Sequence, residues 1–364
     1  MTADSEVMRP PRTSLGVLGW LRQNLFSTWY NALLTLFSAW LLYIFLTGFL
    51  RWALTVARWE VITANLRLFM VGQYPPDQVW RVQVLVSLIA LLFGLSWGIW
   101  KGILRGLAIG LATGFGLLAV LPFSPGVRIW LFSNLIAVFI GFIAGHVLSS
   151  RSERGRLWLA RGTLIAWLLL FPVTVVLLHG FSGTLWLPAV GTNLWGGLLL
   201  TFLLAVVGIL ASFPLGVLLA LGRRSELIVI RGFSILFIEL VRGVPLVTIL
   251  FMAQIMLPLF LPPEVRIDRV IRAMVGITLF SAAYMAENVR GGLQSVPEGQ
   301  VEAARALGLS GPLILLLIVL PQALRAVIPA IVGQFISLFK DTTLVAIIGL
   351  MDLLNVGRAV LANP

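Results

Sequence analysis

The sequence contains no cysteine and only two histidines, and few of its residues are charged. Without cysteine, disulfide bonds and thiolate metal sites are excluded. His146 and His179 lie far apart without metal-ligand spacing, so we interpret both as interfacial or packing residues and expect no metal site. Charged residues make up 11% of the 364 residues, against about 25% in a soluble domain. The composition therefore indicates a chain built for lipid.

Lysine is almost absent, because Lys101 and Lys340 are the only two in the chain. Neither lies in the G-x₄-G-K-[ST] pattern that binds nucleotide phosphates, so the chain carries no P-loop ATPase of its own. The net charge of +12 comes almost entirely from scattered arginines. No basic run resembles a nucleic-acid stripe, and we expect no nucleic-acid partner. Arginines in short loops instead set the orientation of a membrane protein.

Long apolar runs predict an all-α polytopic membrane protein, since about 20 apolar residues span a bilayer as a helix. We expect nine spans, near residues 31–50, 82–100, 104–122, 128–148, 158–178, 197–221, 235–261, 270–289 and 313–350. Pro245 follows the start of the seventh span and is expected to kink it. The last span is interrupted by Pro321, Pro329 and Lys340-Asp341.

Loop charges predict the orientation of these spans. Residues 151–161 and 223–231 are rich in arginine and are placed in the cytoplasm, whereas residues 179–197 carry no charge and are placed outside. Counting back puts the N-terminus, with Arg9, Arg12 and Arg22, in the cytoplasm. The loop 51–81 then lies outside although it carries arginines, which runs against the rule.

Composition also divides the chain. Residues 1–190 are predicted to form an N-terminal extension of about five transmembrane helices, and residues 191–364 a transport core in which acidic residues, proline and glycine recur at membrane boundaries. In the third span, Gly102, Gly106, Gly110 and Gly114 form a ladder whose spacing lets helices approach closely. We interpret this ladder as a packing feature.

The most specific pattern lies in the charged stretch 291–311. It reads E-A-A-x₃-G-x₉-I-x-L-P, from Glu302-Ala303-Ala304 through Gly308 to Pro321. Ser295 and Glu298 have capping-box spacing, and Gly308 suits a left-handed helix end, so we expect a short cytoplasmic helix over about 296–307. Its alanines suit close contact with another protein, and Glu298, Glu302 and Arg305 offer charged contacts.

From about Trp195 onward the chain is similar to the permeases of polar and general L-amino-acid ABC importers. The resemblance rests on segments 238–246, 283–292 and 338–344 together with the Glu302 pattern, and the long extension resembles the M-type subunit of the general L-amino-acid system. It implies a type I ABC importer core in the inner membrane of a bacterium. It also implies that Glu298, Glu302, Ala303, Ala304, Arg305, Gly308 and Pro321 couple the chain to its ATPase.

The resemblance implies the partners as well. They are two copies of an ABC ATPase subunit, a second homologous permease, a periplasmic amino-acid-binding protein and membrane lipid. No cofactor is expected in this chain, because ATP and magnesium would bind to the partner ATPase. The family's core has five spans, and we expect this chain to stop before the last of them.

Charged residues within the apolar segments are candidates for the substrate pathway or for gates, because they are costly in lipid. Glu239 with Arg242 and Glu287 with Arg290 have i, i+3 spacing and are expected to pair as gate or structural ion pairs. Lys340-Asp341-Thr342 could bind a zwitterionic amino acid, with polar contacts from Ser281 and Tyr284, or could form a salt bridge that fixes a helix break.

Three other classes of function make different demands on the sequence. An ion-coupled secondary transporter should show internal repeats and mid-span carboxylates, which are not evident. A membrane enzyme would need a catalytic cluster of titratable or nucleophilic residues, which is also not evident, so the chain is not expected to be an enzyme. A non-transporting or truncated scaffold subunit of an importer remains an alternative.

Overall fold

The computed structural model describes residues 16–100, 102–184, 186–262 and 264–362, which form helices joined by short loops. Arg9, Arg12 and Lys101 lie outside these ranges. The chain divides into two units, residues 1–62 and 63–364, with α3 (Glu60–Ala64) crossing the division. Each unit is described by itself.

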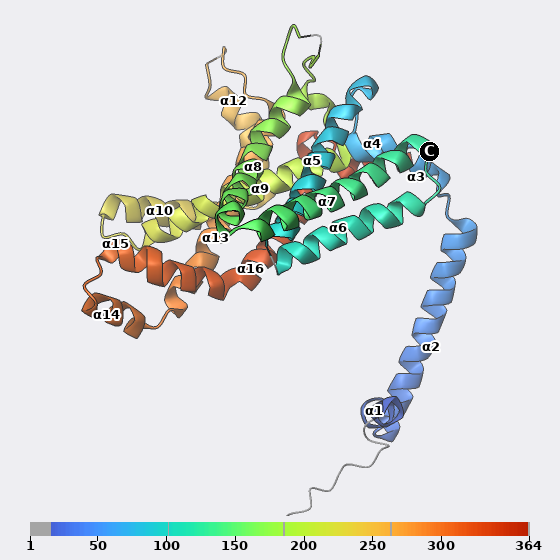
Figure 1. The fold of residues 1–364 in the computed structure, drawn as a ribbon, viewed down its shortest axis with the longest axis horizontal. Coiled ribbons are helices and arrows are strands. Elements are labelled where there is room, and N and C mark those ends of the chain that lie inside the picture. The colour runs from blue at the N-terminus through green and yellow to red at the C-terminus, as the bar shows by residue number, and fades with distance from the viewer. Residues whose placement is uncertain (1–15, 101, 185, 263, 363–364) are drawn as a thin grey trace, which may run out of the picture. The chain divides into compact units, whose positions relative to one another are not determined.

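The first unit contains α1 (Val17–Asn24) and the longer α2 (Trp29–Arg51), followed by a π-helical turn, η2 (Trp52–Val56) (Figure 1). The Thr28 hydroxyl caps α2 by accepting a hydrogen bond from the amide of Asn31 at 3.4 Å. No residue of α2 is buried. A helix that is apolar on all sides and buries nothing in its own unit is suited to lipid.

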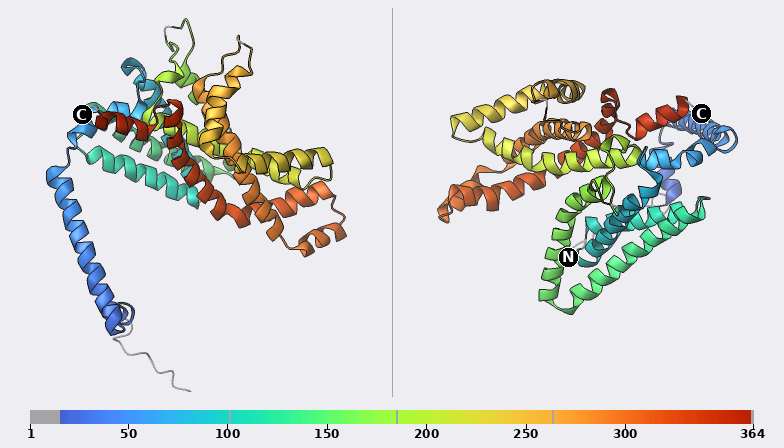
Figure 2. Two further views of the ribbon diagram at one scale, coloured as in Figure 1. Left: turned by 180° about the vertical axis from the view of Figure 1, so that it is seen from behind. Right: turned by 90° about the horizontal axis from the view of Figure 1, so that it is seen from above.

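The second unit begins with α4 (Leu66–Val71) and the turn η3 (Pro76–Gln78). A four-helix bundle follows, consisting of α5 (Val79–Ile99), α6 (Ile103–Val120), α7 (Pro125–Arg151) and α8 (Glu153–His179). In Figure 2 this bundle, coloured cyan to green, lies to one side of the helices from α9 to α16.

Glycines on α5 and α7 bring these two helices into backbone contact. A Cβ atom added to Gly98 would lie 2.6 Å from the backbone amide of His146, and one added to Gly145 would lie 2.7 Å from the carbonyl of Leu95. Real side chains do not tolerate such distances, so glycine is required at both positions. This is the small-residue packing that membrane helices use.

The predicted packing role of the glycine ladder in the third span is wrong within this chain. A Cβ atom added to Gly102, Gly106, Gly110 or Gly114 would meet nothing within 4 Å among the described residues. The four-residue glycine spacing leaves one side of a helix open to close contact, but it does not show that a second helix packs there. Close backbone contact through glycines is found instead between α5 and α7.

The remaining helices start at the turn η4 (Thr192–Leu194) and the long α9 (Gly197–Arg223). They continue with α10 (Ile228–Arg242), α11 (Leu246–Phe251), the π-helical turn η5 (Met252–Met256), α12 (Leu257–Leu259) and α13 (Arg269–Ser295). α9 packs along α13, and a Cβ atom on Gly216 would lie 2.5 Å from Met285. The small residues of α9 thus define the centre of this part of the fold.

Pro245 does more than kink the seventh predicted span. The chain bends by 106° between α10 and the helix Leu246–Leu259. Pro245 has no N–H to continue α10 and forces the preceding residue away from helical geometry. The predicted kink at Pro245 is therefore confirmed, and it is large enough that the segment 235–261 consists of two helices that meet at Gly243–Pro245.

The C-terminal part contains α14 (Glu298–Ala306), then a nearly continuous helix built from α15 (Gly311–Ile314), the π-helical η6 (Leu315–Val319) and α16 (Leu320–Asp341). A 3₁₀ segment, η7 (Thr342–Ile348), and α17 (Leu353–Ala362) follow. At the start of α17, Asp352 is fully buried and caps the helix, accepting hydrogen bonds from the amides of Leu354 and Asn355 at 3.1 Å. Burial raises the pKa of the Asp352 carboxyl.

Among the described residues, eight helices are long and apolar enough to cross a membrane, or nine if the bent pair α10 and α11–α12 counts as one. Each corresponds to one of the nine predicted spans. The prediction of an all-α polytopic membrane protein is thus confirmed.

Segments 72–81 and 177–195 meet through a bridge between Gly72 and Trp195 and a hydrogen bond from Tyr74 to Leu178. Four spans, α5 to α8, separate these two segments in the sequence, so both are expected on the same side of the membrane.

Candidate functional site

The stretch that carries the Glu302 pattern forms a short helix between two long ones. α13 ends at Ser295, the chain turns at Val296–Pro297, and α14 begins at Glu298. The predicted capping box is wrong, because the Ser295 hydroxyl donates to the Gly292 carbonyl at 2.8 Å and no side chain caps α14. Ser295 is the last residue of α13 rather than a residue before α14, so its hydroxyl bonds back along its own helix.

The predicted left-handed end at Gly308 is confirmed. Gly308 has φ +77°, its amide donates to the Arg305 carbonyl at 2.9 Å, and the next amide, Leu309, donates to the Ala304 carbonyl at 3.2 Å. These two bonds form a Schellman motif, which satisfies the last carbonyls of a helix and favours glycine. The end of α14 is therefore fixed by the backbone.

α14 buries one narrow side and exposes the rest. Ala304 is buried and Val301 is half-buried in a cluster with Ile314 and Ala323. Glu298, Glu302, Ala303, Arg305 and Ala306 are exposed, and the Leu307 side chain is 81% exposed. The helix is thus held to the rest of the protein by small apolar contacts while a surface of mixed charge, alanine and one leucine is left open.

α14 is also tied to the helix that carries Pro321. The Gln322 amide donates to the Gln300 side chain at 3.4 Å. Pro321 lies in the first turn of α16, directly after the π-helical turn η6. A π-helical turn shifts the backbone pairing by one residue, and it precedes the place where proline lacks an N–H. The end of the sequence pattern thus marks a change in helix geometry beside α14.

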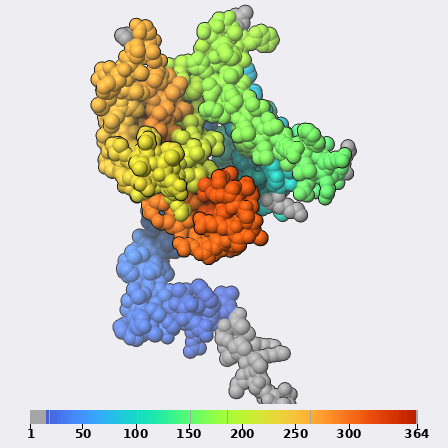
Figure 3. Space-filling view, turned by 90° about the vertical axis from the view of Figure 1, so that its left-hand side faces the viewer, coloured from blue at the N-terminus to red at the C-terminus, as the bar shows by residue number. Residues whose placement is uncertain are grey.

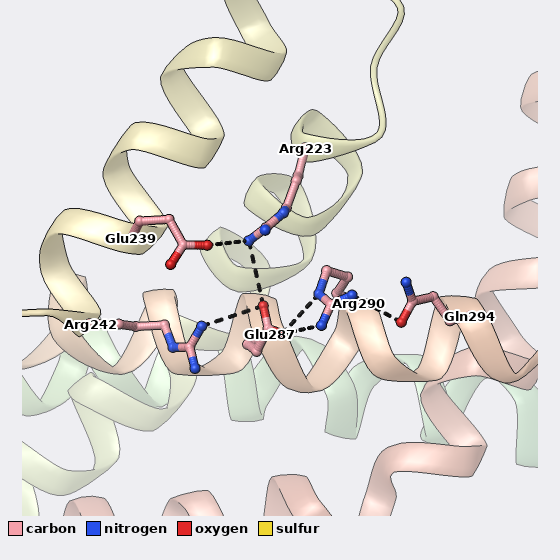
Figure 4. A network of polar contacts seen from close by, with 6 residues as sticks. All are labelled: Arg223, Glu239, Arg242, Glu287, Arg290 and Gln294. Atoms are coloured by element: carbon pink, nitrogen blue, oxygen red, sulfur yellow. Dashed lines mark hydrogen bonds and ion pairs between the residues drawn. The ribbon is translucent and has the colours of Figure 1, made fainter.

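A network of charged side chains lies on the preceding long helix, α13, with Glu287 at its centre (Figure 4). Arg290 donates to Glu287 Oε1, with 2.8 Å between Nε and the oxygen. Glu287 Oε2 lies 3.5 Å from Arg242 of α10 and 3.6 Å from Arg223 of α9. Three helices therefore converge on one carboxylate, and three arginines face two glutamates.

The predicted pairing of Glu287 with Arg290 is confirmed, but that of Glu239 with Arg242 is wrong. Glu239 pairs with Arg223 at 2.9 Å, and Arg242 pairs with Glu287. The i, i+3 rule considers one helix only, whereas the end of α9 brings Arg223 against α10. In the sequence, the basic pair at 223–224 indicates membrane orientation but not a partner on another helix.

The structure assigns Tyr284 and Ser281 to different surroundings. The Tyr284 ring lies under the Arg242 guanidinium, 5.6 Å from ring centre to Cζ, and beside Phe280 at 4.9 Å. Tyr284 therefore belongs to the charged network. Ser281 is 1% exposed, and its hydroxyl has no hydrogen-bond partner among the described residues.

At Lys340-Asp341-Thr342 the α-helix gives way to seven residues of 3₁₀ helix. Lys340 is exposed, Asp341 is half-buried and Thr342 is buried, with its hydroxyl donating to the Phe339 carbonyl at 2.7 Å. In the described part of the chain, Lys340 and Asp341 form no ion pair with each other, so the salt-bridge alternative is wrong. A 3₁₀ run of this length is uncommon and often marks a hinge.

The described residues contain no group of three or more His, Cys, Asp or Glu placed to hold a metal ion. The polar features of this chain are instead an exposed helix at one end of α13, a charged network beside it and a helix break on α16.

Comparison with known proteins gives these features a context. Residues 212–359 match the family described as binding-protein-dependent transport system inner membrane component. Over 374 residues the chain is 38% identical to the inner membrane amino-acid ABC transporter permease protein YhdY of Escherichia coli, covering 98% of this chain and 86% of that protein. It is 37% identical over 384 residues to the glutamate/glutamine/aspartate/asparagine transport system permease protein BztC of Rhodobacter capsulatus, covering 96% and 86%.

A solved structure, described as an amino acid ABC transporter with histidines, is 29% identical over 46% of this chain and 77% of its own, with a TM-score of 0.42. The spans and the family match define a multi-pass inner-membrane component of a binding-protein-dependent transporter. Within that class, the chain belongs to the permeases of amino-acid ABC transporters. The resemblance found in the sequence is thereby confirmed.

Proposed function

We propose that this permease moves polar amino acids inward across the membrane and that α14 is the element through which a separate ATPase drives it. Residues 1–190 would form an extension and residues 191–364 the permease core, beside a second homologous permease. Two ATPase subunits would hold ATP and magnesium, and a periplasmic binding protein would deliver the amino acid. The relative BztC is named for glutamate, glutamine, aspartate and asparagine transport, which supports a polar cargo.

The observation that carries the coupling role is the geometry of α14. Its end is fixed by the Gly308 motif and its inner side by Ala304, while Glu298, Glu302, Ala303 and Arg305 are exposed. A helix held in this way does not need to order itself on binding, so little entropy is lost when a partner docks. Pro321 would act indirectly, through the contact of α16 with α14.

Transport would follow from alternating access. ATP binding would close the ATPase dimer, shift α14 and favour one state of the permease pair, since a ligand moves an equilibrium only through its different affinity for two states. The network around Glu287 would join α9, α10 and α13 near the coupling helix and act as a gate or as structural ion pairs.

Co-purification of the ATPase tests the coupling role. Ala303→Trp places a bulky side chain on the exposed side of α14 and should abolish retention of the ATPase, whereas the same change at Ala189, in the outer loop, should not. Both variants should insert into the membrane normally. Full retention of the ATPase by Ala303→Trp would show that α14 is not the docking element.

For the substrate pathway, we propose the break at Lys340-Asp341-Thr342 with the unpartnered hydroxyl of buried Ser281 as a further polar group; Tyr284 would contribute through Arg242. Lys340 and Asp341 supply one charge of each sign, as a zwitterion requires. Lys340→Gln and Asp341→Asn, made separately, should each raise the KM for uptake while the ATPase stays associated. Unchanged uptake kinetics in both variants would exclude this location.

A further inference from the structure

The connection between α8 and α9 is held by side chains from the preceding bundle. The Tyr74 hydroxyl donates to the Leu178 carbonyl at 2.8 Å. Arg81 donates from Nη2 to the Pro188 carbonyl at 2.9 Å and from Nη1 to the Leu177 carbonyl at 3.4 Å. Both side chains are fully buried. The arginine therefore sits at the C-terminal end of α8, where a cation is favoured by the helix dipole.

Burying the charged Arg81 side chain to hold this loop costs free energy. No carboxylate pairs with Arg81 in the part of the chain that the structure describes, and its Nε has no partner. Removing a charge from water costs several kcal/mol unless hydrogen bonds compensate. A connection that only had to join two helices could leave its carbonyls to water. The buried Arg81 thus indicates that the shape of this loop matters.

The loop backbone is tightly organised around the arginine. Phe181 donates to the Leu187 carbonyl at 2.8 Å, and Val190 donates to the His179 carbonyl at 2.7 Å. Gly180 has φ +68°, and a Cβ atom there would lie 2.9 Å from Arg81 Nη1. Only glycine combines this conformation with such a close approach. The loop is therefore preorganised rather than loosely connected.

The organised loop presents aromatic side chains outward. Phe181 is 52% exposed and Trp186 is 90% exposed. The Thr192 hydroxyl donates to Asp268, which also caps α13, so the loop is joined to the connection between α12 and α13. That connection exposes Phe260, at 77%, and the charged side chains Glu264, Arg266 and Arg269. In Figure 3 the two connections, light green and orange, project at one end with a hollow between them.

Exposed aromatic residues beside charges of both signs resemble the centre and rim of a protein interface, where Trp and Arg contribute most of the binding energy. Glu264 and Arg266 are exposed on the adjoining connection, and charges are costly in hydrocarbon, so this connection reaches past the lipid into water. The family is defined by dependence on a binding protein, and loop charges place this end outside. A protein partner on the outer side fits these observations.

We propose that residues 180–184 and 186–190 form a docking element for the binding protein, and that Tyr74 and Arg81 are positioning residues that hold its shape. The proposal rests on the transport function proposed above. It gives a defined task to α5, which carries Arg81, and to the segment before it, which carries Tyr74: they hold the outer surface of the permease.

The test uses the complete transporter in nanodiscs, and the probe is the purified binding protein whose loaded form stimulates the wild-type ATPase activity. Phe181→Ser and Trp186→Ser should each raise the half-stimulating concentration about tenfold while the basal ATPase activity is unchanged. Tyr74→Phe removes one hydrogen bond and should raise it about two- to tenfold. Tyr43→Phe, which removes a hydroxyl from an exposed side chain of α2, is the matched control and should have no effect.

Arg81→Gln should raise the half-stimulating concentration more than Tyr74→Phe does. Arg81→Lys should raise it less than Arg81→Gln, because lysine keeps the charge but lacks the planar guanidinium that reaches two carbonyls. Arg105→Gln, at an exposed arginine of α6, controls for the loss of one positive charge outside the loop. If Arg81→Gln does not fold, Thr192→Val tests the same loop by breaking its link to Asp268, and it too should raise the half-stimulating concentration.

A wild-type response in both Phe181→Ser and Trp186→Ser would overturn the proposal. A loss of membrane yield in these variants without a change in the response would identify the loop as a lipid anchor and would overturn it as well. The proposed coupling function is checked separately, by retention of the ATPase and by its basal activity. If the variants retain the ATPase and its basal activity but give these outcomes, only the docking proposal is rejected.

Discussion

The left-handed end of α14 at Gly308 allows a quantitative test of coupling. A non-glycine residue in this conformation costs roughly 1–2 kcal/mol, whereas asparagine adopts it more readily than other residues. A Cβ atom at Gly308 would meet nothing within 4 Å, so no clash adds to the cost within this chain. Valine and asparagine at this position therefore differ mainly in backbone preference.

If the fixed end of α14 positions the ATPase, Gly308→Val should weaken the association. A destabilisation of one or two kcal/mol corresponds to a factor of about 5–30, and we expect the dissociation constant of the ATPase to rise by about this factor. Gly308→Asn should stay within about threefold of the wild type, because the left-handed conformation costs it less. Titration of purified ATPase onto the permease complex in nanodiscs measures both values.

Gly299 provides the matched control, since it lies in the first turn of α14 with a negative φ and open space around it. Alanine is the better helix former by about 1 kcal/mol, so Gly299→Ala should leave the affinity unchanged or improve it. Equal losses for Gly308→Val and Gly308→Asn would refute the reasoning, because they would trace the effect to any side chain at this position rather than to the backbone.

Three further outcomes follow from the packing and the charges. Glu287→Gln removes the common partner of three arginines and should lower the thermal stability by about 1–2 kcal/mol, measured by thermal unfolding in detergent. Gly98→Leu should separate α5 from α7 and lower expression and stability strongly, whereas Gly110→Leu, with open space around it, should be tolerated in the same assay. Asp352→Asn keeps a capping oxygen and should stabilise the protein more at pH 8 than at pH 5. The sign follows from the raised pKa of Asp352: its contribution is complete below the unfolded pKa and is lost as pH rises through the folded one. An advantage of Asp352→Asn that grows as pH falls would contradict this assignment.

The spans and the end of α14 were predictable because they depend on local sequence. An apolar run of sufficient length specifies a membrane helix wherever it packs, and Gly308 is favoured by the backbone angle of its own residue. The start of α14 was not predictable from the same kind of pattern. Ser295 has the spacing of a capping box, but it belongs to α13, and where one helix stops depends on contacts beyond the pattern.

Contacts between helices account for the other differences. The spacing of Gly102 to Gly114 is as regular as that of the glycines on α5 and α7, yet only the latter meet another backbone. A spacing pattern describes one surface, and packing requires two. The hydrogen bond from Arg81 to the Pro188 carbonyl also depends on contact between distant segments, because the two residues are 107 apart in the sequence.

The charged network shows that contacts between helices can replace a pairing predicted from the spacing within one helix. The 106° bend after α10 ends that helix at Arg242, where its side chain reaches Glu287 and Tyr284 of α13. Glu239 and Arg242 both lie in α10 with i, i+3 spacing, yet they do not pair with each other. Arg223 instead pairs with Glu239, and Arg242 pairs with Glu287. The pairing is therefore decided by Arg223 of α9 and Glu287 of α13, which contact α10 from neighbouring helices, and not by the spacing within α10.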